Sequence, residues 1–106
     1  MPDANDWKSD MDVTYREIQE INDKLRDLEE KEKYAWGDAE AWWKASSDAL
    51  AERNLPEHEE KKQAHRDASN YHSTLQHQIS DLKTQKQALW DQHNHAKDEW
   101  RRLRGQ

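Results

Sequence analysis

The segment Ile18–Leu28 has the sequence IQEINDKLRDL, in which aliphatic residues alternate with charged and amide side chains. Ile18, Ile21, Leu25 and Leu28 follow one another at steps of three and four residues, which places them on one side of an α-helix. The same spacing continues in both directions, from residue 7 to residue 53. A 3.5-residue repeat held over more than six heptads predicts a left-handed coiled coil.

A second heptad pattern occupies the carboxyl-terminal half of the chain. Its members are Ala64, Ala68, Tyr71, Leu75, Ile79, Leu82, Lys86, Leu89, His93, Ala96, Trp100 and Leu103. Two successive steps of four, at Tyr71, Leu75 and Ile79, predict a stutter, which is a local relaxation of the supercoil. A second long helix is therefore expected.

The two patterns are separated by the sequence RNLPE at residues 53–57. Asn54 tolerates the left-handed conformation that ends helices, and Pro56 suits the first turn of a new helix. A loop this short makes neighbouring helices antiparallel. We therefore predict one all-α domain over residues 1–106, a long antiparallel coiled-coil hairpin. Its helices are expected at about 6–53 and 57–104, joined by a loop at about 54–56.

The predicted hairpin makes specific pairs across its seam, by which we mean the positions where the two helices face each other. Pairs whose residue numbers add to 110 place Ala39 against Tyr71 and Trp42 against Ala68, so that large residues meet small ones. Residues 1–55 carry 15 acidic and 8 basic side chains, whereas residues 56–106 carry 8 and 9. We expect acids near the amino terminus to lie beside Lys97 and the arginines that follow it.

Composition excludes several functional classes. The net charge of −6 disfavours binding to nucleic acid or to an anionic membrane. No nucleophile motif, phosphate-binding loop or cysteine is present, so we expect no enzyme, no cofactor and no small-molecule substrate. A cytoplasmic location is the default expectation.

Histidine is the residue type that most invites a metal-site hypothesis. His58, His65 and His72 are seven residues apart, which spaces them about 10.5 Å along a helix, too far to share one ion. We therefore expect no metal site in one chain and a solvated helix edge at these positions. A site shared across a dimer stays open. His93, by contrast, is predicted to lie in the seam opposite Ile18.

A second line of apolar residues runs beside the seam of the first helix. Its members, which we predict to bind a partner, are Tyr15, Trp36, Trp43 and Leu50, with Trp90 in a similar place on the second helix. These residues could instead widen the hairpin's own core. Exposed tryptophans favour an interface, with a homodimeric four-helix bundle as the first expectation and a hetero-partner helix as the second. Gly37, beside Trp36, permits a bend, a break or a close helix approach.

Three functional hypotheses follow from these features. The first is a non-catalytic protein–protein interaction or assembly module that self-associates through its aromatic-rich helical faces. The second is an acidic inhibitor or decoy, of the kind a phage or pathogen makes, whose negative first helix occupies a basic site on a target. The third is an engineered or selected helical protein without a natural role.

Overall fold

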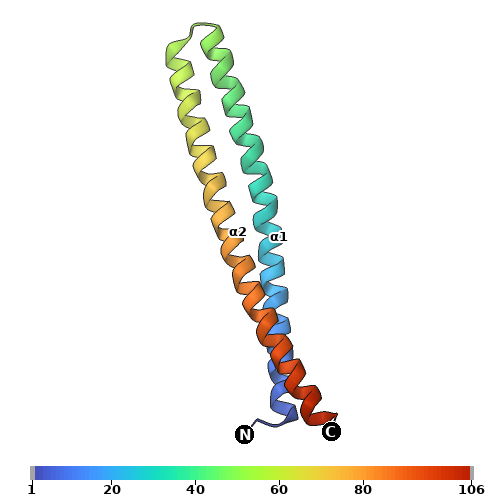
Figure 1. Cartoon of the computed structure of the whole chain (residues 1–106). Helices are drawn as coiled ribbons and strands as arrows, with labels where there is room; N and C mark the ends of the chain where they lie inside the picture. The colour runs from blue at the N-terminus through green and yellow to red at the C-terminus, as the bar shows by residue number, and fades with distance from the viewer. Residues whose placement is uncertain (1, 106) are drawn as a thin grey trace. The chain divides into compact units, whose positions relative to one another are not determined.

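The computed structural model describes residues 2–105, which are all-α. Helix α1 comprises Ala4–Ala51 and helix α2 comprises Leu55–Arg104 (Figure 1). The chain divides into two compact units, one made of Met1–Arg26 with Ser80–Gln106 and the other of Asp27–Ile79. In each unit a segment of α1 lies antiparallel to a segment of α2, which confirms the predicted helical hairpin. Within the described residues, neither helix has a stretch apolar enough to cross a lipid bilayer.

Helix α1 begins two residues before the predicted start because its first turn is capped. The Asp3 carboxylate accepts a hydrogen bond from the Asp6 backbone N–H, and the Asp6 carboxylate accepts one from the Asp3 N–H, each at 3.0 Å. Such a reciprocal pair satisfies two backbone donors that have no partner inside the helix. The negative charge of both groups also lies at the positive end of the helix dipole.

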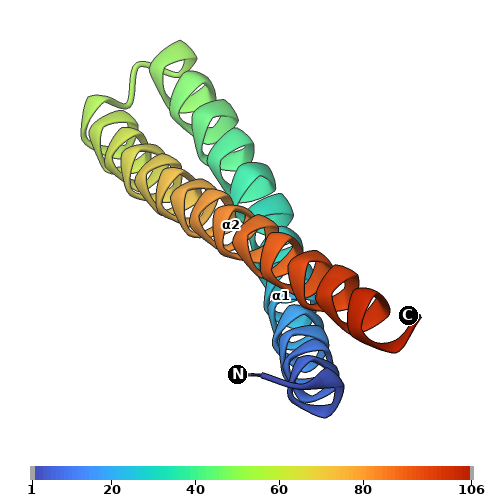
Figure 2. The ribbon, with the colours of Figure 1, turned by 60° about the horizontal axis from the view of Figure 1, so that its bottom comes forward.

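The turn between the helices has the predicted length of three residues but lies two residues earlier, at residues 52–54 (Figure 2). Arg53, not Asn54, adopts the left-handed conformation, with φ of 60°. The Arg53 N–H donates to the Leu50 carbonyl and the Asn54 N–H donates to the Ala49 carbonyl. These are the two hydrogen bonds of a Schellman motif. Asn54 instead caps α2, because its side-chain oxygen accepts from the Glu57 N–H at 3.2 Å. Helix α2 therefore starts before Pro56 rather than after it.

The unit formed by the two chain ends has an aliphatic core. Ile18 is fully buried, and Ile21 and Leu25 of the same helix are nearly so. From α2, Ala96 is 1% exposed. These are residues of the heptad patterns that predicted the two helices, so the apolar repeat does define the core here.

The unit formed by Asp27–Ile79 has a different core, in which the buried α1 residues are small. They are Ala35, Ala39, Ser46 and Ala49, and the buried α2 residues are Leu75 and Ile79. Small side chains let the second helix reach the α1 backbone, which is what the histidines described below do. Trp42, predicted to face Ala68 in the seam, lies at its edge and is 37% exposed, with the Lys61 ammonium 5.1 Å from its ring centroid.

The predicted seam of α2 is wrong in its first half. Tyr71 is 51% exposed, whereas the side chain of His72 is only 12% exposed. Buried or half-buried residues follow steps of three and four throughout α2, at His58, Lys61, His65, Ala68, His72, Leu75, Ile79, Leu82, Lys86, Leu89, His93, Ala96 and Trp100. This helix therefore has no stutter. The predicted stutter followed from placing Tyr71, rather than His72, in the seam.

Helix α1 is continuous through Gly37, so of the three possibilities at this glycine a break is absent. A Cβ atom added to Gly37 would meet nothing within 4 Å. The glycine therefore serves no close helix approach within this chain. The predicted ion pairs at the chain ends are also absent among residues 2–105: Arg102 pairs with Glu99 of its own helix, and the Arg104 guanidinium lies 4.9 Å from the Trp100 ring.

Candidate interaction surface

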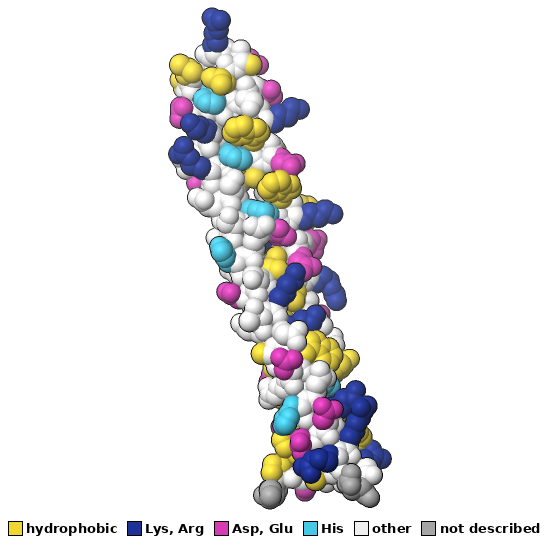
Figure 3. All heavy atoms as spheres, viewed as in Figure 1, with side chains coloured by type: hydrophobic (Ala, Val, Ile, Leu, Met, Phe, Trp, Pro, Cys, Tyr) yellow, Lys and Arg dark blue, Asp and Glu magenta, His cyan; other side chains and the backbone are white. Residues whose placement is uncertain are grey.

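Two rows of residues meet along one side of the Asp27–Ile79 unit. Trp36, Trp43 and Leu50 recur every seven residues on α1, and His58, His65 and His72 recur every seven residues on α2. We call these six residues the aromatic face. Figure 3 shows hydrophobic and histidine side chains alternating in the upper part of this side of the molecule. Because both rows keep the heptad spacing of a coiled coil, each contact between them is repeated at regular intervals.

Histidines of this face are held by the backbone of the opposite helix. The Nδ1 atom of His65 lies 2.8 Å from the carbonyl oxygen of Ala39, and Nδ1 of His58 lies 2.8 Å from that of Ser46. A carbonyl oxygen only accepts, so the Nδ1–H of each ring is the donor. The two carbonyls are seven residues apart on α1, as the two rings are on α2, and their hydrogen bonds fix the rings in the seam.

Tryptophan rings of α1 lie against these fixed imidazoles. The ring centroids of Trp43 and His65 are 5.3 Å apart with an interplanar angle of 52°. Those of Trp36 and His72 are 5.2 Å apart at 48°. Tilted contacts at these distances are favourable for aromatic pairs. Each imidazole therefore supports one edge of an indole and leaves much of the indole outside.

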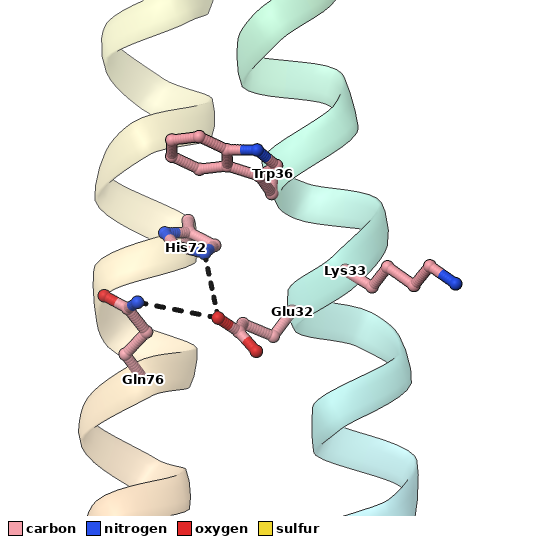
Figure 4. A pocket seen from close by; sticks show the side chains of 5 residues that line it. All are labelled: Glu32, Lys33, Trp36, His72 and Gln76. Atoms are coloured by element: carbon pink, nitrogen blue, oxygen red, sulfur yellow. Dashed lines mark hydrogen bonds and ion pairs between the residues drawn. The ribbon is translucent and has the colours of Figure 1, made fainter.

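The imidazole of His72, which contacts Trp36, also meets the carboxylate of Glu32. Nε2 of His72 lies 3.1 Å from Oε1 of Glu32, and the Gln76 amide donates to the same oxygen at 3.5 Å (Figure 4). These residues line a pocket of about 410 Å³ together with Lys33, whose side chain points away from the others in Figure 4. Glu32 thus has a compensating partner within its own chain.

The aromatic face is not covered by the chain itself. Trp36 is 54% exposed, Trp43 is 59% exposed and Leu50 is 50% exposed. Between the two tryptophans lies a groove of about 410 Å³, lined by Ala39, Glu40, His65 and Ser69 as well as by the indoles. The alternative in which these residues close over the hairpin's own core therefore does not hold for this unit.

The remaining predicted partner-binding residues, Tyr15 and Trp90, belong to the other unit. Both contact His93: the Tyr15 centroid is 6.3 Å from the His93 centroid, and Trp90 meets that ring edge-on at 5.4 Å. Tyr15 is 52% exposed, whereas Trp90 is half-buried. They form a separate and smaller cluster from the three residues of α1 described above.

His93 lies in the seam as predicted, but in a different register. Its Nδ1 is 3.1 Å from the carbonyl oxygen of Met11 and 3.1 Å from Oγ1 of Thr14, a turn or more from the expected partner Ile18. Thr14 is itself 2% exposed. The imidazole thus supplies a hydrogen-bonded polar contact within a buried layer.

The prediction of a solvated edge at His58, His65 and His72 is wrong. All three are half-buried and hydrogen-bonded across the seam. A signal in the sequence points to this row. Before the turn, Trp36, Trp43 and Leu50 are spaced seven residues apart, and after the turn a matching set of three histidines has the same spacing.

A metal centre is a further possibility that histidines raise. Within residues 2–105, no three His, Asp or Glu side chains are grouped closely enough to hold a metal ion. The Nδ1 atoms of His58 and His65 are engaged by carbonyl oxygens. Within the chain, these two histidines take part in hydrogen bonds across the seam.

Comparisons of the chain with protein-family models, with curated proteins and with solved structures find no match.

Proposed function

We propose that this protein is a non-catalytic interaction or assembly module that self-associates through its aromatic face, forming a homodimeric four-helix bundle. The observation that carries the proposal is the row of Trp36, Trp43 and Leu50, each at least half exposed and all on one side of one unit. Apolar rows of this kind are unusual on monomers, and tryptophan is among the residues that most often anchor interfaces.

The exposed indoles are large enough to drive association. Exposed fractions of 54% and 59% leave on the order of 100 Å² of each ring in water. At about 25 cal/mol per Å², covering one ring contributes about 2.5 kcal/mol, and a symmetric dimer covers four. Association costs on the order of 4–15 kcal/mol, so four covered indoles leave at most about 6 kcal/mol, and we expect a dissociation constant of roughly tens of micromolar or weaker.

Pre-formation of the surface also supports the proposal. The imidazoles of His65 and His72 are fixed by hydrogen bonds to α1, and each contacts one indole. A tryptophan that is already held loses less side-chain freedom when a partner covers it, which favours binding. The groove between Trp36 and Trp43 gives the partner a shaped surface rather than a flat one.

Sedimentation velocity of the full chain tests this function. We expect a concentration-dependent dimer for the wild type, and at least 100-fold weaker association for Trp36→Ala/Trp43→Ala, because both copies lose two anchors. Tyr34→Ala/Tyr71→Ala is the matched control, since these tyrosines are 68% and 51% exposed but lie off the aromatic face. A wild type that stays monomeric at about 1 mM, the limit of weak association, contradicts the proposal.

The alternative of an acidic decoy is favoured by a separate observation. Of the 15 acidic residues before position 56, all except Glu32 are exposed. A decoy would bind a basic target with an affinity that falls steeply as salt rises, whereas association through indoles would change little. Repeating the sedimentation in high salt separates the two functions. A cytoplasmic location and a role without catalysis remain predictions.

A further inference from the structure

The aromatic face is bordered by opposite charges at two levels along its length, the carboxylate of Glu32 and the ammonium of Lys62. Lys62, Ser69 and Gln76 recur every seven residues on α2 and share one side of that helix. Ser69 lines the groove between the tryptophans, and Gln76 lines the pocket at Glu32, so this row borders the face. Lys62 is half-buried in the same row, one heptad nearer the turn. The face therefore has a carboxylate beside Trp36 and an ammonium one heptad nearer the turn than the groove residue Ser69.

Glu32 is placed to bind a cation. Its carboxylate is 31% exposed and is fixed through Oε1 by His72 and Gln76. Within the described residues, its Oε2 has no hydrogen-bond partner, and Lys33 points away from the pocket. The Trp36 indole forms a wall of the same pocket. A fixed carboxylate beside an indole suits an ammonium or guanidinium group, through charge and through cation–π attraction.

Lys62 of the same chain is too far away to be that cation. Contacts of His58 with Ser46, and of His65 with Ala39, place Lys62 level with about residue 42 of α1. Ten residues of helix separate that level from Glu32, which is about 15 Å. Both charges are therefore available to a second molecule.

Charge distinguishes the two ways in which two copies can stack these faces around a two-fold axis. In a parallel pair, every residue lies level with its own copy, so Glu32 faces Glu32 and Lys62 faces Lys62. In an antiparallel pair, Glu32 of one copy faces Lys62 of the other. Like charges brought together at an interface cost free energy, so the antiparallel pair is favoured. Glu40 lines the groove between Trp36 and Trp43. It would lie close to Glu40 of the partner subunit in both arrangements, so it favours neither.

The distances suit the antiparallel pair. An axis between Trp36 and Trp43 leaves Glu32 about seven residues away, or about 10 Å. The backbone of Lys62 lies about 4 Å from this axis, on the side opposite Glu32. A lysine side chain directed toward the amino terminus of its helix moves the ammonium about 6 Å further from the axis. The two-fold rotation therefore brings the ammonium of one copy to the level of the carboxylate of the other.

We propose that two copies pair antiparallel through the aromatic face, and that Glu32 of each copy binds Lys62 of the partner subunit beside Trp36. The inference rests on the proposed function and adds to it the direction of pairing and a specific reciprocal ion pair. Each dimer contains this ion pair twice, so a single substitution acts at two places.

Charge reversal tests the ion pair. Glu32→Lys and Lys62→Glu are each expected to weaken dimerisation about ten-fold in sedimentation equilibrium, and the double variant is expected to return to within three-fold of the wild type. Lys31→Glu is the control, because Lys31 pairs with Asp27 of its own helix and does not line the pocket at Glu32, and it should change the dissociation constant less than two-fold. If the swap does not restore association, the ion pair is refuted while self-association still stands.

Introduced cysteines test the direction, since the chain has none. An antiparallel pair should give a disulfide when Glu32→Cys and Lys62→Cys variants are mixed, and little when Glu32→Cys is oxidised alone. A fast disulfide from Glu32→Cys alone indicates a parallel pair and overturns the inference. A monomeric wild type would refute the proposed function as well, and would leave the face to a different partner.

Discussion

Gly37 offers the sharpest test of the helix on which the aromatic face is built. Glycine in the interior of an exposed helix costs about 0.8–1 kcal/mol relative to alanine, because it loses more backbone freedom on folding. The added methyl of Gly37→Ala would meet nothing within 4 Å, so no steric term opposes the gain. We therefore expect the free energy of unfolding to rise by about 1 kcal/mol.

The change is measurable by circular dichroism. For a domain of this size, 1 kcal/mol corresponds to a rise in Tm of roughly 4–8 °C. The matched control is Ala41→Gly, four residues further along α1 and also exposed, which should lower Tm by a similar amount. Self-association should be unaffected, because Gly37 opens onto the side of α1 that carries Tyr34 and Asp38 rather than onto the aromatic face.

An unchanged or lower Tm for Gly37→Ala would refute this reasoning. Such a result would mean either that α1 is not a continuous helix through position 37 or that another molecule approaches the backbone closely there. The two cases differ in concentration dependence: an interrupted helix lowers Tm at every protein concentration, whereas a blocked contact lowers it only where the chain associates.

Two further substitutions test the turn and the seam. Arg53→Gly should raise the free energy of unfolding by about 0.5–1 kcal/mol. The substitution removes the cost of a left-handed arginine, about 1–2 kcal/mol, but the greater freedom of glycine in the unfolded chain offsets part of this gain. A lower urea midpoint would contradict the Schellman turn. His65→Ala should lower it by about 1–3 kcal/mol through loss of the Ala39 hydrogen bond and the Trp43 contact, whereas His77→Ala, at an exposed site, should change it by less than about 0.5 kcal/mol. Equal effects of the two histidine variants would contradict the fixed position of His65.

The apolar heptads predicted the first helix and its core well. Ile18, Ile21 and Leu25 are buried as their spacing requires. Aliphatic side chains have no other way to leave water, so their periodicity determines which side of a helix faces inward. The ends of the helices were less predictable, since the capping pair of Asp3 and Asp6 is a matter of hydrogen-bond geometry.

The candidate surface was predicted in part. Exposure of Trp36 and Trp43 is what their position beside the seam indicates. Their histidine supports were not predicted, because an imidazole is acceptable both in water and in a hydrogen-bonded interior. An acceptor of α1 within reach of the ring decides between the two: the Ala39 carbonyl for His65 and the Glu32 carboxylate for His72. The heptad spacing of the histidines indicates the row but not these acceptors. The pairing of Glu32 with His72 was not predicted either, because it depends on which residues of the two helices lie at the same level.

By itself the sequence determined that the chain forms two helices, that they reverse at a short turn and that a row of tryptophans lies beside their seam. Those features follow from local periodicity and from residues that suit a single backbone conformation. Only the tertiary structure decided that His58, His65 and His72, rather than Tyr71, occupy the seam of α2. For His58 and His65 that choice depends on the small α1 residues Ser46 and Ala39, which leave room for a ring and expose a carbonyl to it, and for His72 it depends on the Glu32 carboxylate. Complementarity of this kind exists only once the two helices are side by side.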